Sequence, residues 1–311
     1  MGAGFWRDLT RTASGLALGW TSKGSWASTN ESMSRKGVTP PPLSASQLRR
    51  EISARNLARG GEQEREVSYG GSASVIWQES GHTHGNFLRA SWARIVANPA
   101  WKQRLQKSYT ASRFVPRAAD RRRFELECAN SSDALLMNVF CYPRVLANPR
   151  VCALVGIEPG LKPEFGFRPG IPLHKGTDRT EIDMKLGNLF VEAKLTEGDF
   201  QRAPLRLLRR YRDLEDVFDV ERLPGANGGV ASYQLIRGVL AARACCASFL
   251  VLCDQRRPDL AERWFGVLTA VRDAALRTRL CLLTWQELSA VLPRPVQKFM
   301  DEKYGIRGCP A

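Results

Sequence analysis

Residues 180–195 read TEIDMKLGNLFVEAKL, and apolar and polar residues alternate on both sides of Gly187 and Asn188. A two-residue turn that begins with glycine is typical of a β-hairpin, because glycine adopts the positive φ that a type II′ turn needs. If this dipeptide is the turn, the register places Asp183 opposite Glu192. The stretch therefore predicts a hairpin that brings two carboxylates face to face.

The same register predicts which side chains share a face of the hairpin. Glu181 would face Lys194, on the side that carries the two carboxylates. The other side would carry the apolar side chains that point into a core, namely Ile182, Met184, Val191 and Ala193.

The carboxylates of Asp183 and Glu192 need compensation in this arrangement. Opposed Cβ atoms of an antiparallel pair lie about 4.5–5.5 Å apart, and like charges there are destabilising. Mg²⁺, which binds one or two carboxylates together with waters and phosphate oxygens, would remove the repulsion. Lys194 could orient an attacking water or stabilise charge that develops on a phosphate. These groups predict metal-assisted hydrolysis of phosphodiester bonds.

With Asp183 on one strand and Glu192-Ala193-Lys194 on the next, the hairpin resembles the PD-(D/E)XK nuclease superfamily, which has the restriction-endonuclease-like fold. The wording EID before VEAK is similar to its restriction-endonuclease and Holliday-junction-resolvase branches. The resemblance implies that Asp183, Glu192 and the carbonyl oxygen of Ala193 bind Mg²⁺ or Mn²⁺. It also implies that Lys194 is catalytic.

The resemblance implies supporting residues outside the hairpin as well. In this superfamily a helix before the hairpin often supplies a further acidic residue, and Glu127 occupies that place, with Glu125 as the alternative. A later helix often brings a glutamine with a nearby tyrosine, and Gln234 matches in type and order. Tyr233 precedes this glutamine instead of following it by a turn, which leaves the role of Tyr233 open.

The net charge of +15 on 311 residues favours nucleic acid as a partner over a membrane surface. Residues 1–123 hold 20 Lys and Arg against 8 Asp and Glu, whereas the remainder holds 26 against 23. The basic surplus therefore lies N-terminal to the hairpin. The candidate nucleic-acid-binding residues are Arg121, Arg122, Arg123, His174, Lys175 and Arg237.

Cysteine usage and hydropathy bear on the cellular compartment. The sequence has eight cysteines, of which five lie in apolar runs, with no CxxC pair and no histidine at zinc-ligand spacing. This pattern predicts reduced core residues of a cytoplasmic protein. No apolar run approaches the roughly 18 residues of a membrane span, so none is expected.

We expect four parts along the chain. Residues 1–45 would be a disordered basic arm, residues 46–123 a basic extension of helices and loops, and residues 293–311 a C-terminal tail. Residues 124–292 would form the nuclease-like domain. There the order helix, strand, hairpin, helices, strand, helix, strand, helix predicts an α/β fold with a mixed central sheet flanked by helices. This order agrees with the αβββαβ core that the resemblance implies.

Apolar spacing places the individual helices. We expect a helix within residues 44–59 that begins at Ser44 or Ser46, and two short helices within residues 86–107 that are separated at Asn98-Pro99. Tryptophans among these basic residues could stack on bases, but their spacing favours burial in a core. One helix each is expected at residues 205–218, 232–244 and 259–275.

The combined expectation is an Mg²⁺-dependent or Mn²⁺-dependent endonuclease that acts on DNA, with RNA not excluded. Cleavage of both strands would favour a homodimer. The first alternative is a non-catalytic nucleic-acid-binding protein that keeps the fold. A third interpretation is a protein-interaction module whose hairpin carries the ion pairs Glu181–Lys194 and Asp183–Lys185.

Overall fold

The computed structural model describes residues 41–60, 65–67, 74–108, 124–226 and 228–308. These residues belong to one compact unit, Thr39–Ala311. The predicted basic arm lies outside the described residues except for its last few positions. Arg121, Arg122 and Arg123 also lie outside them.

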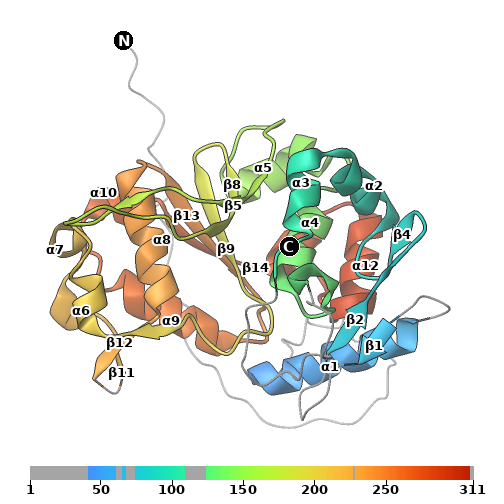
Figure 1. The fold of residues 1–311 in the computed structure, drawn as a ribbon, viewed down its shortest axis with the longest axis horizontal. Helices are drawn as coiled ribbons and strands as arrows, with labels where there is room; N and C mark the ends of the chain where they lie inside the picture. The colour runs from blue at the N-terminus through green and yellow to red at the C-terminus, as the bar shows by residue number, and fades with distance from the viewer. Residues whose placement is uncertain (1–40, 61–64, 68–73, 109–123, 227, 309–311) are drawn as a thin grey trace, which may run out of the picture. The chain divides into compact units, whose positions relative to one another are not determined.

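A mixed five-stranded sheet forms the centre of this unit (Figure 1). Strands β5, β8 and β9 pair antiparallel, and β9, β13 and β14 pair parallel. The order across the sheet is β14 (Leu280–Thr284), β13 (Ser248–Cys253), β9 (Leu189–Ala193), β8 (Ile182–Leu186) and β5 (Glu164–Phe167). The predicted α/β architecture with a mixed central sheet is therefore observed.

The β8–β9 hairpin has the predicted turn and register. Leu186 pairs with Leu189, and Met184 pairs with Val191. Gly187 has a φ of 55°, which is the left-handed conformation that the turn requires. Continuing this register by one residue brings Asp183 opposite Glu192.

Helices cover both faces of the sheet. On one face α8 (Tyr233–Ala244) and α9 (Pro258–Leu268) form an apolar core with the strands, and on the other face α4 (Ser132–Phe140), α5 (Pro149–Val155) and α11 (Trp285–Val291) do so. Met184, Val191 and Ala193 share the second core, as predicted. The prediction is wrong for Ile182, because this first residue of β8 pairs with Phe167 and packs in the first core.

The segments before residue 124 pack on the same unit. Helix α1 (Ala45–Arg59) begins after Ser44, whose side chain forms a capping box with Gln47. It buries Leu48 and Ile52 in the second core and contacts α12 (Arg294–Tyr304), which occupies the predicted tail. The expected extension and tail thus share a core with the sheet.

The other helices of the N-terminal third also match the predicted positions. Helices α2 (Arg89–Ala97) and α3 (Pro99–Arg104) are separated at Asn98, whose side chain caps α3. Trp92 and Trp101 are buried, so these tryptophans are core residues. They do not form a stacking surface for bases.

Two predicted long helices are instead pairs of shorter ones. The first pair is α6 (Leu205–Leu208) and α7 (Leu214–Val217), and the second is α9 with α10 (Ala274–Arg277). The remaining short elements are β1 (Arg65–Val67), β2 (Val75–Trp77), β3 (Glu79–Ser80), β4 (Thr83–His84), β6 (Ile171–Pro172), β7 (Thr177–Asp178), β10 (Arg202–Ala203), β11 (Gly225–Ala226), β12 (Gly229–Ala231), η1 (Glu125–Glu127), η2 (Val145–Ala147) and η3 (Val220–Arg222).

The described cysteines form no disulfide with one another. Cys128, Cys141, Cys152 and Cys253 are buried, as expected for small apolar side chains. Cys281 is exposed on the edge strand β14, so the prediction that it is a core residue is wrong. Among the described residues, none of the helices has the length and apolar character that crossing a membrane requires.

Gly238 lets α8 pack directly on the sheet, which predicts the effect of adding one methyl group. A Cβ at this position would overlap the ring of Phe249 on β13. In an unhindered helix Gly238→Ala would stabilise the chain by about 1 kcal/mol. We expect the overlap to reverse the sign, so that the variant is less stable by about 1–3 kcal/mol in urea unfolding. Gly238→Ala combined with Phe249→Leu should recover part of this loss, and a stabilised single variant would contradict the packing.

Candidate active site

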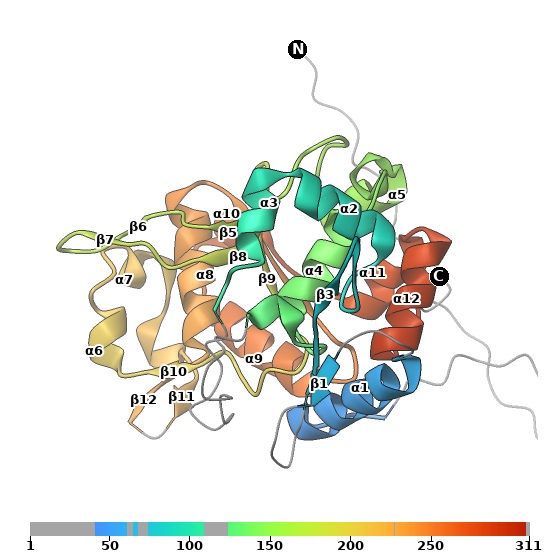
Figure 2. The same ribbon diagram turned by 45° about the vertical axis from the view of Figure 1, so that its right-hand side comes forward.

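A pocket of about 390 Å³ opens where the chain leaves β9. Figure 2 shows β9 between α8 and α4. The first turns of both helices contribute lining residues of the pocket, which are Gln234 and Ser132. The pocket brings together four of the predicted site residues, namely Asp183, Glu192, Lys194 and Gln234. Gln234 reaches it from the first turn of α8, and the other three come from the hairpin and the residue that follows it.

A hydrogen bond holds the carboxylate of Asp183 against β9. Its Oδ2 accepts the main-chain N–H of Ala193 at 2.9 Å. Lys194 donates its own N–H to the carbonyl oxygen of Leu252 on β13, at 2.8 Å, and its carbonyl oxygen accepts the indole N–H of Trp285 at 2.9 Å. The main chain on either side of Lys194 is therefore fixed, and its side chain is directed by the fold.

Glu192 and Lys194 form a buried ion pair in the pocket wall. The side chains of both residues are 7% exposed, and Lys194 Nζ lies 2.8 Å from Glu192 Oε1. The ion pairs Glu181–Lys194 and Asp183–Lys185, considered for a surface hairpin, are not formed, because Lys185 and Glu181 have other partners. Lys185 binds Glu164 at 2.9 Å, and Glu181 binds Arg104.

Burial and neighbouring charges shift the pKa values of the two central groups, Asp183 and Lys194. Burial and the neighbouring charge of Glu192 raise the pKa of Asp183 well above its usual value. Burial alone would lower the pKa of Lys194, but the charges of Glu192, Glu197 and Asp183 outweigh it and raise this pKa. Lys194 therefore keeps its positive charge near neutral pH, whereas burial and the charge of Glu192 both disfavour the ionised form of Asp183.

The acidic residue before the hairpin that reaches the pocket is Glu125, the alternative considered from the sequence. Glu125 Oε2 lies 3.2 Å from Lys107 Nζ, and both residues line the pocket. The carboxylate of Glu127 accepts the N–H of Phe124 at 3.2 Å and does not line the pocket. The reason is that residues 125–127 form the 3₁₀ helix η1 and not an extended segment, so the two carboxylates diverge.

A buried carboxylate that the sequence did not single out lies behind this region. Asp133, in the first turn of α4, is 2% exposed. Arg104 Nη2 lies 2.8 Å from Asp133 Oδ2, and Lys107 Nζ lies 2.6 Å from it. Burial would raise the pKa of Asp133, but these two cations outweigh it and lower the pKa. The only signal in the sequence was an acidic residue after the capping Ser131.

Arg49 of α1 is a second lining residue that the sequence did not single out. Its Nη2 donates to the carbonyl oxygen of Thr196 at 3.3 Å, and its Nε is buried without a hydrogen-bond partner. The other two cations of the pocket wall, Lys107 and Lys194, bind carboxylates. Among the described residues, Arg49 is thus the cation of this pocket that forms no ion pair with a carboxylate.

The pocket wall carries more carboxylates than cations. Arg49, Lys107 and Lys194 face five acidic side chains, which are Glu125, Asp183, Glu192, Glu197 and Asp199. Within the described part of the chain, no group of three or more His, Cys, Asp or Glu residues is arranged to hold a metal ion by itself.

The other predicted nucleic-acid contacts lie outside this pocket. His174 and Lys175 are exposed on the turn between β6 and β7. Arg237 is largely buried on α8, with Nε 4.0 Å from Asp178 Oδ2 and its guanidinium 4.9 Å from the ring centre of Tyr233. The charge of Arg237 is therefore directed at a carboxylate inside the protein.

The mixed sheet, its flanking helices and the hairpin pocket are compatible with the restriction-endonuclease-like class. The sequence model of a family described as Restriction Endonuclease associating with ARP matches residues 51–305. The chain belongs to this family, which confirms the restriction-endonuclease-like resemblance. No curated protein and no solved structure matches the chain. The matched region begins within α1 and includes the elements before residue 124.

Glu125 predicts a pH dependence of stability. Burial and the charge of Asp133 raise the pKa of Glu125 to about 7, from 4.5. The folded chain therefore keeps a proton that the unfolded chain loses, and this stabilisation is complete below about pH 4.5 and is lost as pH rises through 7. The free energy of unfolding of Glu125→Gln should change less with pH than that of the wild type, by at most about 1.4 kcal/mol per pH unit. Urea unfolding between pH 5 and 8 measures this, and parallel curves for both proteins would contradict it.

Proposed function

We propose that this chain is an endonuclease that hydrolyses phosphodiester bonds of DNA with the help of Mg²⁺ or Mn²⁺. The observation that supports this function best is the convergence of Asp183, Glu192 and Lys194 on one open pocket. They do so in a chain whose family is one of restriction endonucleases. The positive net charge of the chain suits a polyanionic substrate.

The pocket has the donor chemistry that Mg²⁺ requires. Asp183 and Glu192 would hold the ion, together with the carbonyl oxygen of Ala193, while waters and a phosphate oxygen complete its coordination. The raised pKa of Asp183 and the excess of carboxylates in the wall both mark a site that a dication would neutralise. When bound, the ion supplies positive charge at the reacting phosphate and lowers the pKa of a coordinated water.

Lys194 acts as a cation in this proposal and not as a proton acceptor. Its pKa is raised, so the ammonium group keeps its protons when DNA binds. It can then donate a hydrogen bond to the attacking water or to a phosphate oxygen, where negative charge grows in the transition state. Gln234 lies in the same pocket and can orient that water through its side-chain amide. Arg49 can also bind the phosphate, because its charge is not held by a carboxylate.

The alternative function is binding of nucleic acid without cleavage. The observation in its favour is the buried Lys194–Glu192 ion pair, which satisfies both groups without any ligand. The two functions differ in their dependence on metal. EDTA should stop cleavage and leave simple binding almost unchanged. RNA in place of DNA, and a homodimer that cuts both strands, are further proposals for the same site.

Cleavage of plasmid DNA tests the catalytic assignment. We expect Asp183→Ala and Lys194→Ala to lower the Mg²⁺-dependent rate at least a hundredfold, because they remove a metal ligand and the cation at the phosphate. The matched control is Lys185→Ala, which removes a lysine of the same hairpin whose partner is the exposed Glu164. Circular dichroism should show that all three variants fold. Equal rates for the wild type and both site variants would refute the assignment.

Thermal unfolding with Mn²⁺ tests the metal site without any cleavage. A cation that binds only the folded chain stabilises it by about 2.7 kcal/mol at a hundredfold excess over Kd. Asp183→Asn should keep the hydrogen bond from Ala193 and lose this stabilisation. Without metal at neutral pH the variant should be at least as stable as the wild type, because a like charge is removed. The control Asp213→Asn should respond to Mn²⁺ as the wild type does.

A further inference from the structure

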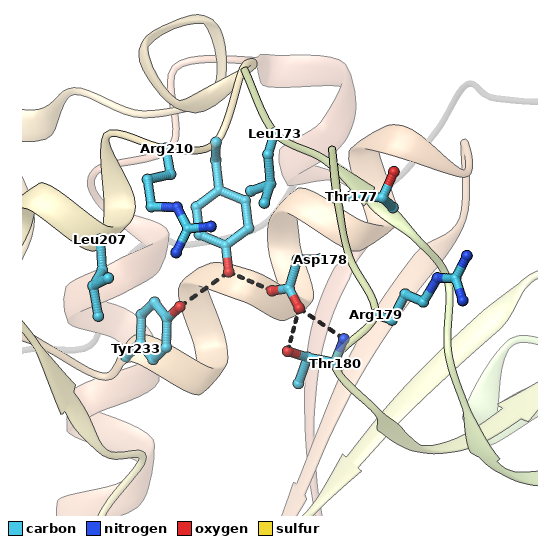
Figure 3. Close-up of a pocket in the computed structure, with 9 residues that line it drawn as sticks. Leu173, Thr177, Asp178, Arg179, Thr180, Leu207, Arg210 and Tyr233 are labelled. Carbon is cyan, nitrogen blue, oxygen red and sulfur yellow. Dashed lines mark hydrogen bonds between the residues drawn. The ribbon is translucent and has the colours of Figure 1, made fainter. Parts of the chain in front are cut away.

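A second pocket has a volume of about 250 Å³ and shares no lining residue with the candidate active site (Figure 3). Residues of β7 and the loop after it form one side, and the α6 segment with the first turn of α8 forms the other. Tyr233 lines this pocket and Gln234 lines the catalytic pocket. Successive side chains of a helix project in different directions, so the first turn of α8 contributes one lining residue to each pocket.

A fixed hydrogen-bond network forms the floor of this second pocket. Asp178 Oδ1 accepts the N–H of Thr180 at 2.8 Å and its hydroxyl at 2.5 Å, and Asp178 Oδ2 accepts the hydroxyl of Tyr211 at 2.5 Å. The oxygen of Tyr211 lies 3.1 Å from that of Tyr233. Because Tyr211 donates its only hydroxyl proton to the carboxylate, Tyr233 must be the donor to Tyr211.

The charge inside this network is balanced. Burial would raise the pKa of Asp178, but hydrogen bonds from Thr180 and Tyr211 outweigh it and lower the pKa, so Asp178 is an anion. Arg237 lies 4.0 Å from it and covers the ring of Tyr233. Arg237 therefore serves as a positioning residue for the floor of the pocket, in contrast to its predicted role as a direct contact to nucleic acid.

The rim of the pocket carries cations that the protein does not pair. Figure 3 shows Arg179 and Arg210 on opposite sides of Asp178, and both are exposed. Among the described residues, the ion pairs near the rim involve Arg168, Arg212 and Arg237 instead. Three further exposed cations extend the same surface, namely Lys175, Arg206 and Arg209.

Main-chain hydrogen bonds join the two sides of this surface. His174 donates its N–H to the carbonyl oxygen of Arg210 at 2.9 Å, and Arg212 donates to that of Pro172 at 3.2 Å. The β6–β7 turn and the segment after α6 thus form one rigid cationic surface. A single phosphate ion would contact only a few of these cations, whereas a nucleic-acid strand presents a row of phosphates to the whole cationic surface.

We propose that the second pocket binds a backbone phosphate of duplex DNA. Arg179 and Arg210 bind this phosphate from both sides, and Lys175, Arg206 and Arg209 bind neighbouring phosphates of the same duplex. The inference rests on DNA as the substrate of the proposed function, and it does not require cleavage.

Binding of a short DNA duplex in EDTA tests the proposal without any chemistry. The variant Arg179→Ala/Arg210→Ala should bind more weakly than the wild type. The slope of log K against log salt concentration should fall by about 0.9, the value for one neutralised phosphate. The control Arg150→Ala/Arg294→Ala removes the same charge from exposed positions on α5 and α12 and should leave the slope unchanged.

Each outcome of this experiment is decisive for the pocket. Equal affinity and slope for the two double variants would overturn the proposal. A second result would also overturn it. If the wild type binds the mononucleotide dAMP, and Arg179→Ala/Arg210→Ala abolishes this binding but leaves duplex binding unchanged, the pocket holds a free nucleotide. If the wild type binds the duplex as expected but cleaves no DNA in the presence of Mg²⁺ or Mn²⁺, the proposed endonuclease activity is refuted, whereas the phosphate-binding pocket is supported.

Discussion

The charge of Asp133 is the constraint on which the active-site region depends. This carboxylate is almost fully buried, and Arg104 and Lys107 compensate it from a segment that precedes it by more than 25 residues. Arg104 also binds Glu181, two residues before Asp183. Removing one partner of such a buried pair leaves an uncompensated charge and typically costs about 3–5 kcal/mol. The pairs therefore fix α3, the first turn of α4 and the start of β8 relative to one another.

The same contacts show that the elements before residue 124 form part of the pocket and its surroundings. Lys107 reaches the pocket from the N-terminal third, and so does Arg49 from α1. Helix α1 is held by its own apolar side chains in the core of the sheet. A chain shortened to the αβββαβ elements would lose two of the three cations of the pocket wall together with the partners of Asp133.

Local patterns in the sequence predicted the hairpin, its register and the positions of α1, α8, β13 and α11, because each of these is specified by nearby residues. The expected helix over residues 205–218 fails for a tertiary reason. Tyr211 bridges to Leu173, and Arg212 donates to Pro172, so these long-range hydrogen bonds interrupt the helical periodicity. Burial of Asp133 had no local signal either, since an acidic residue in the first turn of a helix is common at the surface. The pairing of Asp183 with Glu192 was predictable, whereas partners more than 20 residues away were not.

Gly238 has a mechanical consequence beyond packing. Because it seats α8 directly against the ring of Phe249, this helix has no room to slide along the sheet. The first turn of α8 supplies Tyr233 to one pocket and Gln234 to the other. Any displacement of α8 would therefore move a lining residue of each pocket at the same time, so that the shapes of the two pockets depend on one helix position.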